Sequence, residues 1–169
     1  MNIRVADIVE DSIVDGAGIR LAVFVQGCPH HCPGCHNPAT HSFSGGHIID
    51  TETILAKLQA NPLITGLTLS GGEPFAQAES LVFLAQNVRN RGYDVWCYTG
   101  YTLAELMTMN DAYVSALLAQ IDVLVDGPYI EAERDLSLPF RGSRNQRLID
   151  LPRTLHEGRI ILWEQNNIG

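Results

Sequence analysis

Short, largely apolar runs recur along the chain, and segments with a helical period separate most of them. The runs cover 21–25, 66–70, 95–98 and 123–125. Continuous rather than alternating hydrophobicity is typical of strands that are buried on both faces of a sheet. Leu67, Val95 and Val123 follow one another at intervals of 28 residues, which indicates repeated β-α-β units with parallel strands.

Helical patterns fill the intervals between the later runs. Residues 51–60 follow Asp50, which can cap a helix, and residues 77–90 repeat apolar side chains at i, i+3, i+4 and i+7. One or two further helical pieces are expected within 103–120. The pattern predicts an α/β fold with a single domain over 1–169. Because a full eight-fold barrel takes about 250 residues, we expect a partial (β/α) barrel of five or six parallel strands with the helices outside.

The regular alternation ends after Tyr129. Residues 130–158 have no clear period and contain five arginines. A segment of that length without regular structure is usually functional in a compact domain, so we predict a long loop that is functional or faces a partner. Residues 159–163 are apolar enough to close the sheet, and the tail to Gly169 is expected to fray.

Composition restricts the classes of function. Apolar residues make up 46% and charged residues 18% of the chain, and the formal net charge is −8. Nucleic-acid binding needs clustered Lys and Arg to neutralise phosphates, so we expect no nucleic-acid partner. No run approaches the roughly 18 apolar residues of a membrane span, and the first residues lack the apolar core of a signal peptide. The expected location is cytoplasmic, with no membrane partner.

Candidate chemistry is concentrated in the loop after the first strand, Cys28-Pro-His-His-Cys32-Pro-Gly-Cys35. Its prolines and glycine prevent a regular helix or strand, so the three thiols lie on a tightly wound loop. Three thiolates fit a cubane iron–sulfur cluster with one iron free of protein ligands, since a fully ligated cluster takes four cysteines. Cysteines in a reducing compartment are more often metal ligands or catalytic groups than bridges.

Other interpretations of the cysteine loop remain open at this point. A zinc site needs a fourth ligand, which one of five nearby histidines could supply. These are His30, His31, His36, His41 and His47. Cys32 and Cys35 also form a Cys-x-x-Cys pair, as in thiol oxidoreductases, and structural disulfides are a third alternative. Cys97 lies in the middle of a predicted strand, where we expect it to pack as a small apolar group.

Loops with glycine or polar residues follow the predicted strands, at the edge where active sites gather in parallel α/β folds. The cysteine loop after the first strand and Gly71-Gly-Glu-Pro74 after the second together resemble the radical S-adenosylmethionine superfamily. Within it, the chain is most similar to activases of glycyl-radical enzymes, in particular those of the anaerobic ribonucleoside-triphosphate reductase. The similar segments are 14–20, Trp96, 99–101, 123–127 and 140–146.

The resemblance implies that Cys28, Cys32 and Cys35 hold three irons of one [4Fe-4S] cluster, whose fourth iron chelates S-adenosyl-L-methionine. It implies an oxidoreductase that cleaves this cofactor reductively to a 5′-deoxyadenosyl radical, with no catalytic side chain beyond cluster and cofactor. The radical would take hydrogen from a glycine of the partner, the glycyl-radical subunit of the anaerobic ribonucleoside-triphosphate reductase. A flavodoxin or a ferredoxin would donate the electron.

Alternatives accompany this hypothesis. Cys35-His-Asn37 is more similar to activases of pyruvate formate-lyase, so another glycyl-radical enzyme is an alternative partner. A non-catalytic zinc-binding module belongs to a different class, but zinc explains neither the Gly-Gly-Glu-Pro segment nor the polar strand ends. A thiol oxidoreductase is disfavoured because its Cys-x-x-Cys pair typically opens a helix.

The resemblance also implies contacts with the cofactor beyond the cluster. Gly71 and Gly72 would let the backbone approach the methionyl ammonium, and Glu73 would accept charge-assisted hydrogen bonds from it. The competing interpretation is a simple turn at the end of a strand. The arginines within 134–147 would pair with a carboxylate or dock the partner, or else form a solvated surface.

Residues beside the last cysteine, Cys35, would lie against the adenine of the cofactor. Gly34 would contribute only backbone contact, and His36 would stack. Thr99 and Asp126, at the ends of later strands, would reach the ribose or the carboxylate side, with a cap or turn contact as the alternative.

Overall fold

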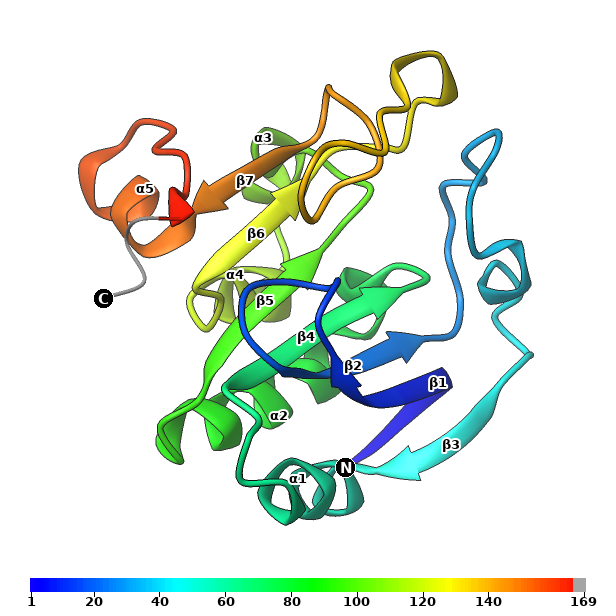
Figure 1. The fold of residues 1–169 in the computed structure, drawn as a ribbon, viewed down its shortest axis with the longest axis vertical. Coiled ribbons are helices and arrows are strands. Elements are labelled where there is room, and N and C mark those ends of the chain that lie inside the picture. Colours follow the sequence, from blue (N-terminus) through cyan, green and yellow to red (C-terminus); the bar gives the residue numbers. More distant parts are fainter. Residues whose placement is uncertain (166–169) are drawn as a thin grey trace.

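A mixed sheet of seven strands forms the centre of the computed structural model, which describes residues 1–165 of the chain (Figure 1). The strands are β1 Asn2–Ser12, β2 Arg20–Val25, β3 His47–Asp50, β4 Gly66–Gly71, β5 Asp94–Tyr98, β6 Val123–Asp126 and β7 Arg147–Asp150. Their order across the sheet is β3-β1-β2-β4-β5-β6-β7. Residues 166–169, which include the expected frayed tail and the end of the expected domain 1–169, lie outside the described residues.

Most of the helices begin at a residue whose side chain caps their first turn. They are α1 Thr51–Ala60, α2 Ala78–Asn90, α3 Leu103–Thr108, α4 Ala112–Leu118 and α5 Leu151–Glu157. Asp50 accepts a hydrogen bond from the backbone of Glu52 at the start of α1, and Thr102 forms a capping box with Glu105 at the start of α3. The predicted helices at 51–60 and 77–90 are therefore confirmed, the second starting one residue later.

Four neighbouring strands of the sheet, β2, β4, β5 and β6, are parallel. They are the four strands that the apolar runs predict. In the described residues β1, β3 and β7 are antiparallel to their neighbours, whereas five or six parallel strands were expected. The loop between β1 and β2 is too short for a crossover, which takes a dozen or more residues, so this pair is antiparallel. Closure of the sheet into part of a barrel stays a prediction.

The two faces of the sheet pack against different partners. Val95 and Cys97 of β5 belong to the large core that the sheet forms with α1 to α4, while Trp96 and Tyr98 belong to a second cluster on the opposite face. This alternation follows from the two-residue period of a strand. On the second face the loop between β1 and β2 crosses in front of β4 and β5 (Figure 1). Side chains on that face are therefore covered by loops rather than helices.

The segment 130–158 is more regular than the sequence predicts. β7 and α5 occupy its second half, and the loop that joins β6 to β7 contains a short 3-10 helix at Glu131–Glu133. The pattern misses β7 because it has only four residues, and α5 because it is a short helix with a proline in its first turn. The closing strand expected at 159–163 is wrong, since Leu162 forms a single isolated bridge to Ile149.

Candidate active site and metal centre

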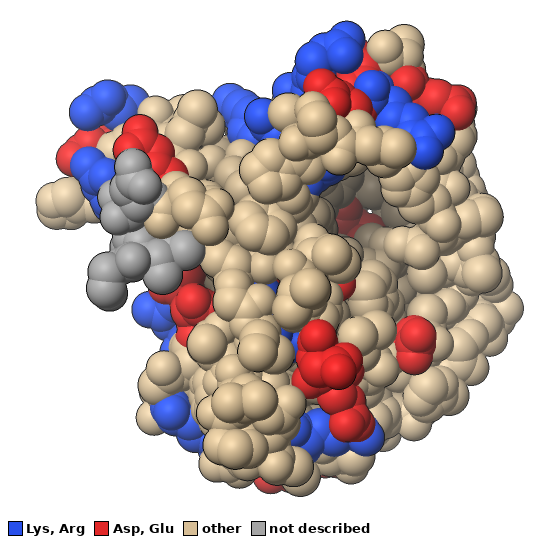
Figure 2. Space-filling model, viewed as in Figure 1, with Lys and Arg blue, Asp and Glu red and all other residues tan. Residues whose placement is uncertain are grey.

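A cavity lies at the carboxyl ends of the parallel strands, where the loops that follow β2, β4, β5 and β6 meet. In the space-filling view the molecule is hollowed beside the charged residues of the 131–144 segment (Figure 2). The predicted site residues that line the cavity are Cys28, Cys32, Cys35, His36, Gly71, Gly72 and Thr99. Gly34, Glu73 and Asp126 are not part of the lining. The structure thus brings most of the predicted site together and moves three residues out of direct reach.

The cysteine loop is fixed to the chain that returns from it. The backbone N–H of Cys28 donates to the carbonyl of His41 (3.2 Å), and that of Gly27 donates to Thr40 (2.7 Å). Within the loop, Cys35 donates from its backbone to Cys32 (3.1 Å). These bonds hold the three thiols at one cavity without regular secondary structure.

All four cysteines of the described chain are free thiols, and only three of them lie in the cavity. Cys28 is buried, and this burial raises the pKa of its thiol. Cys97 is fully buried on the helix side of β5, where burial raises the pKa of its thiol strongly. The prediction that Cys97 packs as a small apolar group is confirmed, and it is not placed to act as a fourth ligand.

The three thiols of the cavity fit the donor set of an iron–sulfur cube. Within residues 1–165 no three His, Cys, Asp or Glu side chains lie close enough to share one metal ion. In a cubane cluster each thiolate binds a different iron, so the sulfurs need to surround a common space rather than touch a common atom. Three cysteines around one cavity, with the fourth turned into the core, are a donor set for three irons.

Gly71 and Gly72 hold the second motif close to the first. Their loop is hydrogen-bonded to the end of β2, since Gly72 donates to Val25 and Glu73 donates to Gly27, both at 2.8 Å. A Cβ atom on Gly72 would lie 2.3 Å from the carbonyl oxygen of Gly27, and one on Gly71 would lie 2.6 Å from the nitrogen of Val25. Both glycines also line the cavity. The close packing of the two loops beside Cys28 therefore requires glycine at both positions, independently of any ligand in the cavity.

Glu73 is fully buried, and donors from the protein surround its carboxylate. Oε1 accepts from His30 Nε2 at 2.6 Å, from Thr99 Oγ1 at 2.9 Å and from the backbone N–H of Gly100 at 2.9 Å. Oε2 accepts from the backbone N–H of Phe75 at 3.0 Å. This arrangement places Glu73 as a link between the cysteine loop and the ends of β4 and β5, rather than as a group facing the cavity.

Asp126 has an equivalent internal role at the end of β6. It is almost fully buried and accepts two bonds from the guanidinium of Arg147 on β7, at 3.0 and 2.6 Å. It also accepts from the backbone N–H of Leu103 at the start of α3 (2.9 Å). The hydrogen bond to Asp126 raises the pKa of Arg147. Asp126 thus makes a contact at the start of α3, and its approach to the cofactor stays a prediction.

The two residues that flank Cys35 are separated by the structure. His36 lines the cavity, and its ring is tilted against that of Tyr129, with 4.8 Å between ring centroids. Gly34 adopts a left-handed conformation with φ of 75°, and a Cβ atom there would lie 2.6 Å from the carboxylate of Glu131. His36 is thus placed to contact a ligand in the cavity, and Gly34 packs against the loop that follows β6.

Gln146 is a lining residue that sequence reasoning gave no role, and His30 and His41 were considered there only as zinc ligands. His30 stands between two of the cysteines, which is the signal that could have singled it out. Gln146 accepts from the backbone of Gly142 and Ser143 and donates to Gly127, so it shapes the wall formed after β6. His41 lines the cavity from beyond the cysteine motif, where nothing in its neighbouring residues indicates a contact.

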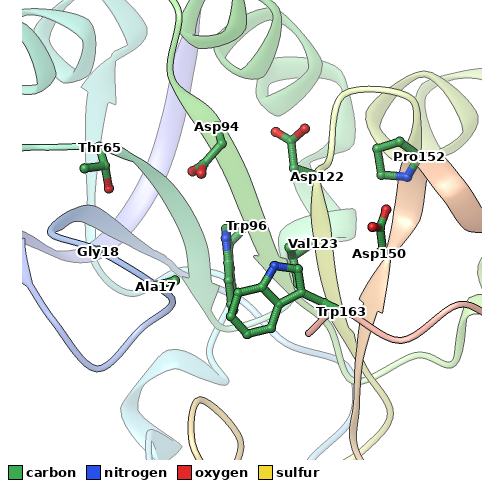
Figure 3. A pocket seen from close by; sticks show the side chains of 10 residues that line it. All are labelled: Ala17, Gly18, Thr65, Asp94, Trp96, Asp122, Val123, Asp150, Pro152 and Trp163. Atoms are coloured by element: carbon green, nitrogen blue, oxygen red, sulfur yellow. The ribbon is translucent and has the colours of Figure 1, made fainter. Parts of the chain in front are cut away.

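A second cavity lies at the opposite edge of the parallel strands (Figure 3). Asp94, Asp122 and Asp150 line it together with the indole rings of Trp96 and Trp163, whose centroids are 5.0 Å apart. Asp94 accepts from the buried guanidinium of Arg20 at 2.6 Å. Burial lowers the pKa of Arg20, and the charge of Asp94 opposes that effect.

The other two carboxylates of the second cavity also have donors. Asp122 pairs with Arg89 at 2.6 Å and accepts from the backbone of Val95, and Asp150 accepts from the backbone of Arg153 at the start of α5. All three carboxylates are therefore used by the fold. No helix within residues 1–165 is long and apolar enough to cross a membrane.

Comparison with known proteins places these observations in a family. Residues 14–149 match the model of the 4Fe-4S single cluster domain. An anaerobic ribonucleoside-triphosphate reductase-activating protein of Vibrio cholerae is 44% identical over 142 residues, which cover 79% of this chain and 89% of the relative. The proteins of the same name from Escherichia coli K12 and Enterobacteria phage T4 are 36% and 35% identical, over 79% and 80% of this chain and 90% and 86% of their own lengths.

Proposed function

Because the chain belongs to the family of anaerobic ribonucleoside-triphosphate reductase-activating proteins, with its 4Fe-4S single cluster domain, we propose that it is a radical-generating activase. It uses an iron–sulfur cluster and S-adenosyl-L-methionine to install a glycyl radical on the anaerobic ribonucleoside-triphosphate reductase. The observation that carries the proposal is the set of three free thiols around one cavity at the strand ends, with the fourth cysteine buried in the core.

Cys28, Cys32 and Cys35 are the residues that would hold the cluster. When bound, the cluster and S-adenosyl-L-methionine supply a one-electron cleavage of the sulfonium that yields methionine and a 5′-deoxyadenosyl radical. The contribution of the chain is to leave one iron without a protein ligand, because no fourth cysteine reaches the cavity.

The residues that share the cavity with the thiols are the proposed contacts of S-adenosyl-L-methionine. Gly71 and Gly72 expose backbone beside Cys28, Thr99 lies at the end of β5, and His36 offers an imidazole ring. Glu73 and Asp126 are proposed to act one step away, since both are buried and hold other parts of the wall. The wall is thus fixed before the cofactor arrives, which reduces the ordering that binding requires.

A flavodoxin or a ferredoxin is the proposed electron donor, and the cytoplasm the proposed location. The surface around the cavity offers room for a protein partner. A groove between the β1–β2 loop and the β6–β7 loop shares His36, Tyr98 and Gly142 with the cavity, and the exposed apolar residues Val14 and Leu136 lie along it. Exposed apolar side chains beside an active site are typical of a protein-binding surface.

The test is an anaerobic incubation of the reduced protein with S-adenosyl-L-methionine and the reductase, followed by electron paramagnetic resonance. We expect a glycyl-radical doublet with the wild type and none with Cys32→Ala. A parallel incubation with pyruvate formate-lyase examines the alternative partner, because Cys35-His-Asn37 is similar to its activases. A doublet only with pyruvate formate-lyase would reassign the partner, and a colourless protein that contains one zinc and no iron would overturn the proposal.

A further inference from the structure

His41 lines the cysteine cavity and has a buried side-chain nitrogen. Among the described residues, three buried side-chain nitrogen or oxygen atoms have no hydrogen-bond partner, on His41, Arg141 and Asn145. Of these three residues, only His41 lines the cavity that contains the three thiols. Its unpartnered atom is Nε2. A buried polar atom without a partner is destabilising, so its presence at this cavity requires an explanation.

The backbone of His41 is held by a hydrogen bond that also holds the first cysteine. The carbonyl of His41 accepts from the backbone N–H of Cys28 at 3.2 Å, and its own N–H donates to Pro38 at 3.2 Å. The ring also meets that of His31 edge to face, with 5.1 Å between centroids. His41 is therefore held beside Cys28 by backbone contacts, and its side chain is not a loosely attached surface group.

We propose that Nε2–H of His41 donates a hydrogen bond to a sulfur atom of the iron–sulfur cluster, either an inorganic sulfide or a cysteine thiolate, and raises the reduction potential of the cluster. The inference rests on the proposed function, because it requires the cluster to be present. Sulfur atoms of such clusters accept hydrogen bonds, and these bonds are among the factors that set the potential. The bond stabilises the reduced state because that state carries one more negative charge.

The role assigned to His41 is that of a positioning and tuning residue, since the thiols alone hold the irons. A potential set too low would leave the cluster oxidised in the presence of its electron donor. A donor bond from His41 makes that reduction easier without adding a ligand, so one iron remains free of protein ligands.

The test compares three variants with the wild type as reconstituted holoproteins. His41→Phe keeps an aromatic ring and removes the donor, whereas His41→Gln restores a donor. His31→Phe is the matched control, because His31 is an exposed neighbour of the same loop and packs against the same ring. Iron content is measured first, and the midpoint potential is then taken from a potentiometric titration of the reduced-cluster resonance.

We expect His41→Phe to retain its iron and to lower the ratio of reduced to oxidised cluster about tenfold at a fixed potential, which is about 59 mV for one electron. His41→Gln should recover much of this shift, and His31→Phe should show none. In the reduced wild type, electron–nuclear double resonance should detect the nitrogen of labelled histidine across the hydrogen bond, and His41→Phe should lose that coupling.

An unchanged potential in an iron-loaded His41→Phe variant would overturn the inference and leave the proposed function intact. If that variant fails to load iron, the electron–nuclear double resonance measurement on the wild type provides the test. Absence of any histidine nitrogen coupling in its reduced cluster would also overturn the inference. Failure of the proposed function has a different signature, because the wild type itself would then not assemble a four-iron cluster.

Discussion

The parallel strands have a cavity at each of their ends. We call the cavity with the three aspartates at their amino ends the amino edge, and the cavity with the three cysteines at their carboxyl ends the carboxyl edge. The two cavities differ in how far the fold already uses their reactive groups. At the amino edge, three carboxylates accept from arginines or backbone N–H groups. At the carboxyl edge, the three thiols are in no disulfide and accept at most backbone N–H groups, and one buried imidazole nitrogen has no hydrogen-bond partner. The amino-edge cavity is the larger, at about 380 Å³ against about 210 Å³. Neither size nor the number of titratable groups therefore identifies the active site; unused donors and ligands do.

The partners at the amino edge show what its charges do. Arg20 is fully buried, donates to Thr68, Leu67 and Asp94, and lies 5.4 Å from the centroid of the Trp96 ring. It thus joins β2, β4 and β5 on the face that the helices do not cover. A buried guanidinium is tolerated because each of its nitrogen atoms has an acceptor. The charged groups of this cavity support the sheet, whereas at the carboxyl edge the buried carboxylates of Glu73 and Asp126 do so and the three thiols remain available to a ligand.

The largest expected effect comes from removing one thiol at the carboxyl edge. Cys32→Ala should prevent assembly of the cluster, because two thiolates remain for three irons. Iron should fall from about four per chain to well below one, and the absorbance near 400 nm should disappear. Cys97→Ala is the matched control and should keep its iron, with a stability loss of about 1 kcal/mol from the buried volume removed. Normal iron in Cys32→Ala would contradict the ligand assignment.

A slightly smaller effect is expected from Gly72→Val. The added side chain would meet the carbonyl oxygen of Gly27, whose neighbour is Cys28. The clash therefore displaces the cysteine loop, so iron and S-adenosyl-L-methionine binding should both fall several-fold, not cofactor binding alone. Iron analysis and equilibrium binding measure the two separately.

Gly92→Ala is the control for the effect of losing a glycine. Unlike Gly72, Gly92 has a positive φ, of 88°, and a Cβ atom there would meet nothing within 4 Å. The variant should lose about 1 kcal/mol from backbone strain and keep its iron. If Gly72→Val retains full iron and loses only cofactor affinity, the close packing of the two motifs is less important than the contact with the cofactor.

The sequence predicts the carboxyl edge better than the amino edge, for physical reasons. Cysteines and glycines gather within short stretches of chain, so their spacing alone indicates a shared site. The pairs that hold the amino edge, such as Arg20 with Asp94, join residues 74 positions apart, and no local pattern encodes them. Glu73 shows the same difficulty. The sequence assigns it to the site, but it does not show that its carboxylate is bound by His30 and Thr99, because these two residues lie in other loops.

At the amino edge, Asp94→Ala tests whether pairing there serves only the fold. It removes an acceptor from a buried guanidinium, so the free energy of unfolding should fall by about 2 kcal/mol. This loss is smaller than for a fully buried ion pair, because about half of the Asp94 side chain is exposed to solvent. Iron content and cofactor affinity should match the wild type at a temperature where the variant is folded. A loss of radical formation with full stability would show that the amino edge takes part in the reaction.

The smallest effect concerns Tyr98, which lines the carboxyl-edge cavity from the loop-covered face of the sheet. Its hydroxyl donates to the carbonyl of Phe140 at 2.5 Å, and burial, with a smaller effect of Asp15, raises the pKa of the phenol. Tyr98→Phe should cost about 1 kcal/mol at pH 7 through the lost hydrogen bond.

Because the unfolded phenol loses its proton near pH 10 while the folded one keeps it, this group lowers the stability of the wild type as the pH rises above about 10. Denaturant titrations between pH 8 and 11 should therefore show a shallower decline for Tyr98→Phe than for the wild type, and parallel curves would mean that the phenol ionises as readily in the folded protein as in the unfolded chain.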